Sequence, residues 1–227
     1  MSADKKEYQK TLDYIYKEIK KGNLRLGDKL PTERYLSQTL SIGRGSIREA
    51  LRMLENIGMI ESRQGSGNYL TGKVSGGITE SMRLMLMLNQ TTTQDIQIFR
   101  KNFEKAVCIS IIEKGLKANW KNKLHKILAE ARACQDTTKR IKLDKEFHET
   151  LIYATENPLW ISTGEAIVEL YQKDLTATLK KTENSVKMAL HLEHLSILST
   201  LEKGNRQACE QAIDRHYGLI ERESEKR

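Results

Sequence analysis

Three histidines and one aspartate in the second half of the chain have the residue types and spacing of a metal site. Asp144 and His148 stand four residues apart in LDKEFHETL, so they share one helix face and lie one turn apart. His194 and His216 are separated by 22 residues, with Gly204-Asn205 almost midway between them. A helical hairpin folded at that break brings both imidazoles level. One carboxylate and three imidazoles from three helices are a donor set for a divalent cation.

Spacing alone does not decide between a metal site and unrelated histidines on several helix faces. His191 precedes His194 by three residues and is able to replace it on that face. His125 has no partner in the sequence, so we expect it at the surface or near a helix end. No general base stands beside the four residues, which disfavours a metalloenzyme. A metal that is itself the signal, or a purely structural metal, remains an alternative.

The elements that must position these residues are helices. The chain of 227 residues contains only two prolines, Pro31 and Pro158, and apolar residues recur at helical spacing beyond residue 78. Helices are predicted over about 79–88, 94–115, 119–134, 138–155, 159–181, 185–203 and 205–224. We therefore predict an all-α antiparallel helical bundle for this part of the chain.

A glycine-rich segment without periodicity, GKVSGG at 72–77, marks a boundary in the chain. We predict an N-terminal domain over 1–73, a linker and connecting helix over 74–92, and the helical domain over 93–227.

Residues 30–67, LPTERYLSQTLSIGRGSIREALRMLENIGMIESRQGSG, predict two short helices followed by a small hairpin. Thr32 is the expected N-cap of the first helix, and Ser41-Ile42-Gly43 ends that helix. The second helix runs from about Arg44 to Ile57. Strand-like segments at 59–62 and 68–71 flank a glycine-rich tip. This order is that of a winged helix-turn-helix, so the fold class is mainly α with a small β-hairpin wing.

Four arginines occupy positions from which such a domain reaches DNA. Arg44 and Arg48 share one face of the second helix, where a guanidinium binds a guanine edge or a phosphate. Arg34 lies near the start of the preceding helix and Arg63 in the hairpin. A single arginine of this kind is usually a surface residue, but four in this order favour DNA binding. Residues 1–73 hold 14 Lys/Arg and 9 Asp/Glu, so they carry +5 of the net charge of +8.

The cysteines and the N-terminus indicate the compartment. Cys108, Cys134 and Cys209 are widely spaced and form no CxxC pair, so we expect reduced, buried side chains. The N-terminus, MSADKKEYQK, has no apolar signal core. The longest apolar run is far shorter than a membrane span. We predict a cytoplasmic protein that has no membrane partner.

Residues 5–72 resemble the winged-helix domain of GntR-family bacterial transcription regulators. The resemblance rests on three elements: Leu-Pro-x-Glu-Arg, Arg-x-x-x-Arg-Glu-Ala-Leu and Gly-x-Gly. The sequence departs from the family pattern at Gly43 and Gly45, where hydroxyl-bearing residues or proline are usual; the glycines remove phosphate contacts and loosen the helix start. The resemblance implies that the residues which contact operator DNA or shape the contact surface are Glu33, Arg34, Arg44, Ser46, Arg48 and Gly65.

Residues 93–222 resemble the FCD ligand-binding domain of the FadR subgroup of that family. The motifs that carry this resemblance are Phe99-Arg100-x-x-x-Glu104, Asp144-x-x-x-His148, Asn157-Pro158, and Glu193-His194 followed by Gly204 and His216. In metal-binding members an aspartate and three histidines hold zinc, nickel or a similar ion. The resemblance therefore implies a divalent metal bound by Asp144, His148, His194 and His216.

In such domains the metal and a basic residue often hold an organic acid. Arg100 is the candidate to pair with an effector carboxylate, because a guanidinium fork matches a carboxylate bidentately. An ion pair between Arg100 and Glu104, four residues apart, is an equally good alternative. The whole chain is thus predicted to be a ligand-responsive DNA-binding transcription regulator and not an enzyme. We expect a homodimer on a near-palindromic operator and a small carboxylate effector.

Overall fold

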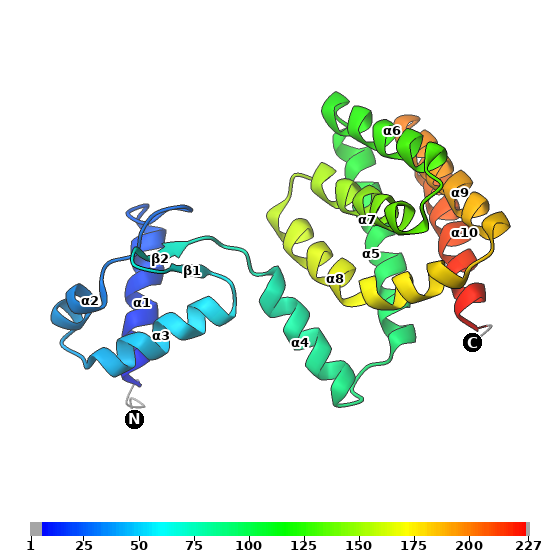
Figure 1. The fold of residues 1–227 in the computed structure, drawn as a ribbon. Coiled ribbons are helices and arrows are strands. Elements are labelled where there is room, and N and C mark those ends of the chain that lie inside the picture. The colour runs from blue at the N-terminus through cyan, green and yellow to red at the C-terminus, as the bar shows by residue number, and fades with distance from the viewer. Residues whose placement is uncertain (1–5, 226–227) are drawn as a thin grey trace. The chain divides into compact units, whose positions relative to one another are not determined.

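The structure is a computed structural model that describes the backbone of residues 6–225, and their side chains except 173–175, 177–181 and 224–225. The chain divides into two compact units, Met1–Glu80 and Ser81–Arg227. Both are built mainly from helices, as predicted (Figure 1). The division falls inside helix α4 (Ser75–Met87), within the segment expected to connect the domains.

Before α4, the described part of the first unit contains three helices and a two-stranded antiparallel hairpin (Figure 1). The helices are α1 (Glu7–Lys20), α2 (Glu33–Leu40) and α3 (Arg44–Asn56), and the strands are β1 (Ile60–Arg63) and β2 (Gly67–Leu70). Ile60 pairs with Leu70 and Arg63 with Gly67. The order confirms the predicted winged helix-turn-helix. Its core consists of apolar side chains from every element, among them Ile15, Leu36, Ile47, Leu54, Ile60 and Leu70.

Local sequence explains where α2 and α3 begin and end. The Thr32 hydroxyl accepts a hydrogen bond from the backbone N–H of Tyr35 at 3.2 Å, which confirms the predicted N-cap. Ser41 ends α2 in a left-handed conformation with φ of 53°. The Ser37 hydroxyl donates to the carbonyl of Ile42 at 2.7 Å and so closes the turn. These bonds fix the direction in which α3 leaves the turn.

After α4, the described part of the second unit forms a bundle of six helices, as the periodicity predicted (Figure 1). Helices α9 and α10 form an antiparallel hairpin around Gly204, which has φ of 64°. Among the described residues, twenty-three buried side chains form one core, in which Phe147, Leu151, Ile197 and Ile213 are fully buried. The helices are α5 (Thr93–Lys114), α6 (Ala118–Ala133), α7 (Thr137–Ala154), α8 (Pro158–Lys181), α9 (Asn184–Glu202) and α10 (Arg206–Glu225).

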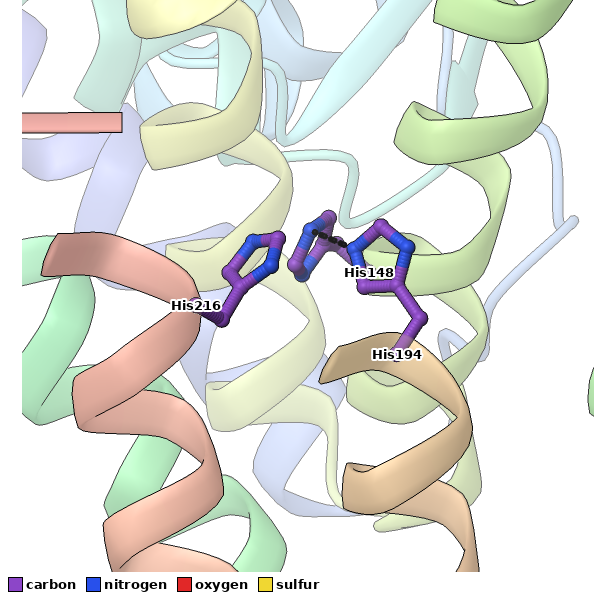
Figure 2. A group of neighbouring side chains, drawn as sticks. All are labelled: His148, His194 and His216. Atoms are coloured by element: carbon purple, nitrogen blue, oxygen red, sulfur yellow. Dashed lines mark hydrogen bonds between the residues drawn. The ribbon is translucent and has the colours of Figure 1, made fainter. Parts of the chain in front are cut away.

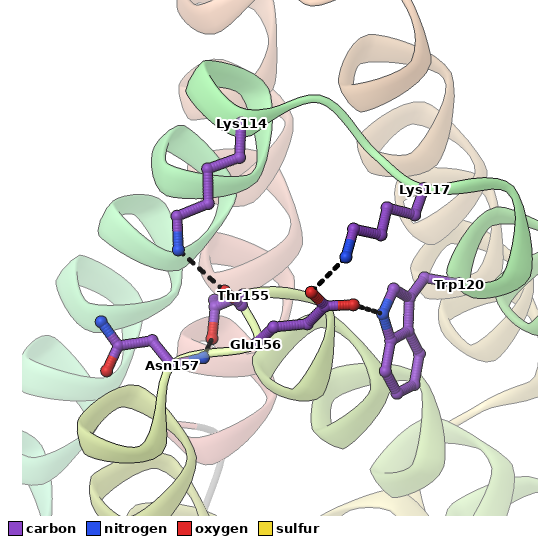
Figure 3. Close-up of polar contacts among 6 residues, drawn as sticks. All are labelled: Lys114, Lys117, Trp120, Thr155, Glu156 and Asn157. Carbon is purple, nitrogen blue, oxygen red and sulfur yellow. Dashed lines mark hydrogen bonds and ion pairs between the residues drawn. The ribbon is translucent and has the colours of Figure 1, made fainter.

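Polar contacts tie the α5–α6 connection to the α7–α8 connection (Figure 3). The Lys114 ammonium donates to the carbonyl of Thr155 at 3.0 Å. The Glu156 carboxylate pairs with Lys117 and accepts from the Trp120 indole N–H at 3.1 Å. The two connections thus hold one end of the bundle, and Pro158 begins α8 directly after them.

The glycine-rich segment is where the predicted start of a helix differs most from the structure. Helix α4 begins at Ser75 and includes Gly76 and Gly77, whereas the helix was expected from about residue 79. A Cβ on Gly77 would lie 3.0 Å from the Cα of Ile57, so a tight backbone contact requires this glycine. No helix among the described residues is long and apolar enough to cross a lipid bilayer.

Candidate metal centre and DNA-binding surface

Three helices of the second unit direct one histidine each to a common point (Figure 2). His148 comes from α7, His194 from α9 and His216 from α10. The ring centroids of His194 and His216 are 4.4 Å apart, which confirms that the α9–α10 hairpin brings them level. The three side chains are buried, and one nitrogen of each lies within 4.8 Å of the others.

The nitrogen atoms of this cluster suit a shared cation. Nε2 of His148 and Nε2 of His194 are 3.3 Å apart. Two nitrogens each about 2.0–2.1 Å from one tetrahedral ion are separated by about 3.3 Å. Both ring nitrogens of His216 are buried without a hydrogen-bond partner among the described residues. Buried imidazoles normally satisfy at least one nitrogen, so the residues present fit a bound metal.

Asp144 stands beside the histidines rather than within their tight group. Its Oδ1 lies 3.4 Å from Nε2 of His194, and its Oδ2 is buried without a partner among the described residues. Burial raises the pKa of this carboxyl, although His148 and Arg100 partly oppose the effect. Because ionisation of a buried carboxyl group is unfavourable, a cation bound beside Asp144 would stabilise its carboxylate form.

Burial also sets the charge of the histidines. It places the pKa of both His194 and His216 well below the ordinary value, and the neighbouring histidines and Arg100 add to the effect. Both rings are therefore neutral at physiological pH. A neutral imidazole offers the free lone pair that metal coordination needs.

Glu104 on α5 is a residue of the site whose role the sequence did not reveal. Its Oε2 lies 2.7 Å from Nδ1 of His148 and accepts from the Tyr217 hydroxyl at 2.9 Å. Burial opposes ionisation of Glu104, but the bond and charge of His148 and the charge of Arg100 lower its pKa overall. An ionised Glu104 holds the proton of His148 on Nδ1 and leaves Nε2 for a metal. The sequence signals were its position one turn after Arg100 and its place in the motif that resembles the FCD domain, and neither indicated a contact with His148.

Arg100 is buried, only 4% exposed, behind this cluster. Its guanidinium carbon lies 4.8 Å from the Tyr171 ring and 5.4 Å from the Tyr217 ring. No ion pair between Arg100 and Glu104 is found among the described residues. Burial disfavours its charge, but the negative groups around it raise its pKa above the ordinary value. The structure thus places the positive charge of Arg100 near the carboxyl groups of Glu104 and Asp144.

A cavity reaches the cluster from another side. Asp144 and His194 line it together with residues of α6, α7 and α9, and Arg100 does not. His191 also lines it, and so lies on the predicted face without joining the group of three. His125 is exposed and pairs with Glu202 at 2.6 Å, in line with its expected surface position. The cysteines are buried and unbridged, as predicted.

Five of the predicted DNA-contacting residues, Glu33, Arg34, Arg44, Ser46 and Arg48, lie at the starts of α2 and α3. Arg34 and Arg44 are exposed. Nε of Arg48 donates to Oε2 of Glu33 at 2.8 Å, so α2 fixes one edge of that guanidinium while its terminal nitrogens remain for a ligand. The hydroxyl of Ser46 donates to Oε2 of Glu7 on α1, also at 2.8 Å.

The wing and the two unusual glycines complete this surface. Gly65 sits at the tip with φ of 70°, a conformation that favours glycine. Arg63 stacks on the Tyr69 ring, with its guanidinium carbon 4.2 Å from the ring centroid. Gly43 is the N-cap of α3 and Gly45 its second residue, and a Cβ on either would meet no atom within 4 Å. Both glycines therefore leave open space at the start of α3.

Comparison with known proteins decides the family. Residues 7–70 match the family described as bacterial regulatory proteins, gntR family, and residues 95–219 match the FCD domain. The chain belongs to the GntR family and carries an FCD domain. It is accordingly a DNA-binding, ligand-responsive transcription regulator and not an enzyme.

Similar proteins cover both domains. The HTH-type transcriptional regulator LutR of Bacillus subtilis is 28% identical over 207 residues, which are 89% of this chain and 94% of LutR. The Uxu operon regulator of Haemophilus influenzae is 24% identical over 92% of this chain and 78% of its own. The solved structure of Streptococcus agalactiae GntR shares the fold, with a TM-score of 0.72, 23% identity and coverage of 95% of this chain and 99% of that chain.

Proposed function

We propose that this regulator binds a near-palindromic operator as a homodimer and responds to a small organic acid through a metal in its FCD domain. The observation that carries the proposal is the buried group of His148, His194 and His216, whose nitrogens lie within 4.8 Å of one another. Such a protein acts where chromosomal DNA lies, in the cytoplasm.

The metal would be held by the three histidines and Asp144. A donor set of imidazoles and one carboxylate suits zinc or nickel. The unpartnered atoms of His216 and Asp144 support this assignment, since a cation would satisfy them. A bound ion would supply a positive charge that binds an anionic ligand. Glu104 would keep the His148 ring in the tautomer that coordinates.

The DNA-binding roles are proposed for the residues at the start of α2, the start of α3 and the wing tip. Arg48, oriented by Glu33, is the candidate to read a guanine edge in the major groove. Arg34 and Arg44 are exposed and would bind phosphates or base edges, with Ser46 beside them. Gly65 would let the wing backbone approach the DNA closely.

A dimer is supported by apolar side chains that the single chain leaves exposed. Ile98 and Phe99 at the start of α5 are 44% and 49% exposed, and Leu84 and Leu88 on or directly after α4 are exposed as well. Two-fold symmetry in the protein matches two half-sites in DNA. Sedimentation velocity of the purified protein tests this part of the proposal, and a monomer at micromolar concentration would refute it.

The metal assignment is tested by elemental analysis of the purified protein. The wild-type chain should carry stoichiometric zinc or nickel, and His194→Ala should lose most of it. His125→Ala is the matched control, because His125 is exposed and lies outside the cluster. Full metal occupancy in His194→Ala would refute the assignment. The variant should still bind DNA through its first unit.

A further inference from the structure

The cavity that reaches Asp144 and His194 is lined by apolar side chains and by two groups of polar residues. Its volume is about 60 Å³, room for roughly four to six water molecules. Its walls are apolar side chains from α6, α7 and α9, including Ile127, Phe147 and Met188. Apolar walls bind the carbon chain of a small molecule and leave its polar groups to the polar lining residues.

Beyond the metal cluster, the charged side chains that line the cavity are all cationic. Arg132, Arg140 and Lys187 line it, and Asp144 is the one carboxylate among its lining residues. None of the three cations forms an ion pair with a carboxylate in the described part of the chain. Nε2 of His191, also in the lining, is buried without a hydrogen-bond partner. Uncompensated cations and an unused ring nitrogen on one cavity are features of an anion site.

Arg140 is the best placed of these cations. Its Nε donates to the backbone carbonyl of Cys134 at 2.7 Å, which anchors the guanidinium at the start of α7. The side chain is half-buried, whereas Arg132 is exposed. A guanidinium has five N–H groups in a fixed fork, so the terminal nitrogens of Arg140 remain for a second partner. An anchored guanidinium loses less conformational entropy when it binds a carboxylate.

We propose that the cavity selects organic acids with two anionic groups, one directed to the Asp144–His194 end and the other bound by Arg140 and Lys187. This inference rests on the proposed metal, because the first group needs a cation at that end. It differs from the expectation that Arg100 binds the effector, since Arg100 lies outside the cavity against Tyr171 and Tyr217. The ligand class is therefore a short dicarboxylate rather than a monocarboxylate.

The test is isothermal titration calorimetry on the full-length, zinc-loaded protein at fixed ionic strength. Malonate, succinate and glutarate are compared with propionate, butyrate and valerate, so each pair matches in carbon number. The best diacid should bind at least about tenfold more tightly than its matched monoacid, as expected for a charge-assisted bidentate contact. Arg140→Gln should remove that advantage. Lys142→Gln, exposed on the same helix and outside the cavity, should retain it.

Two further measurements keep the test decisive. Lys187→Gln also reduces the diacid advantage, so the inference does not depend on one variant that loses the bond to Cys134. Zinc content and the melting temperature are measured for each variant, and both should match the wild type closely. Equal affinities for diacids and monoacids overturn the inference and leave the metal-dependent acid site intact, as does a diacid preference that survives in both variants. If neither diacids nor monoacids bind to the zinc-loaded protein, both the diacid inference and the proposed metal-dependent acid site are refuted.

Discussion

Nδ1 of His148 lies 2.7 Å from Oε2 of Glu104, and both side chains are buried. The Tyr217 hydroxyl donates to the same carboxylate oxygen at 2.9 Å, and burial raises the pKa of Tyr217, so that hydroxyl stays protonated. The acceptor for the His148 proton is thus held from two sides. Nε2 of His148 faces His194 as a consequence.

Glu104→Gln should therefore weaken metal binding. The amide keeps the size of the side chain but removes the charge that favours the Nδ1 proton, and loss of such a partner typically costs about 10–100-fold in metal affinity. Competition with a chromophoric zinc chelator measures the change. Glu113→Gln, exposed on the same helix, is the control. Unchanged zinc affinity in Glu104→Gln would show that Glu104 does not position His148.

Arg48→Ala should weaken operator binding by about 1–3 kcal/mol and relax the preference for one base pair. Glu33 orients the Arg48 guanidinium at 2.8 Å, so the side chain enters the groove in a fixed direction. Fluorescence anisotropy with the operator and with single-base variants measures both effects. Arg206→Ala, on the first residue of α10, should leave the affinity unchanged. A uniform loss on all DNA sequences would instead assign Arg48 to a phosphate.

Replacing each of two glycines of the first unit by alanine should change the stability of that unit in opposite directions. Gly45→Ala should stabilise the unit by up to about 1 kcal/mol, because Gly45 is helical and a Cβ there meets no atom within 4 Å. Gly58→Ala should destabilise the first unit by about 3 kcal/mol or more. Its φ is +77°, and the Cβ would lie 2.0 Å from the Lys73 carbonyl oxygen. Urea unfolding measures both. A stabilising Gly58→Ala would contradict the backbone contact.

The metal-free protein should lose stability as the pH falls below about 6.5. His194 and His216 have pKa values well below the unfolded value of about 6.5, so the unfolded chain binds more protons in that range. Their contribution is fully present above pH 6.5 and declines toward the folded pKa. The raised pKa of Asp144 acts in the opposite sense, but through one group rather than two.

Urea midpoints between pH 7.5 and 5 check this prediction. His216→Asn should flatten the profile, because it removes one of the two buried titrating rings. His125→Gln should leave it unchanged, since His125 is exposed. A wild-type midpoint that does not change between pH 7.5 and 5 would contradict the assignment of neutral, buried imidazoles.

Most of the fold follows from local sequence signals. Helical periodicity and end signals such as Thr32, Gly204 and Pro158 placed the helices within a few residues of their observed ends. The glycine-rich segment misled the prediction because composition indicates a loop, whereas Gly76 and Gly77 lie inside α4 and Gly77 packs closely against the backbone of Ile57. That contact joins distant residues and has no local signal.

The site was predictable only in part for the same reason. The spacing of His194 and His216 around a turn is a local property, and the structure brings the two rings to 4.4 Å. The surroundings of Arg100 depend on Tyr171 and Tyr217 from two other helices, which residue spacing along α5 does not reveal. The position of Arg140 on a cavity likewise depends on the packing of three helices.

The most direct test of the central claim is the operator affinity of the full-length protein with and without both metal and acid. The operator is a fragment selected from random DNA by the wild-type protein, and the acid is the tightest binder in the calorimetry series. In the zinc-loaded protein the acid should change the dissociation constant about 5–150-fold. After chelation the acid should have no effect. An unchanged response after metal removal, or no response in the zinc-loaded protein, would contradict the account.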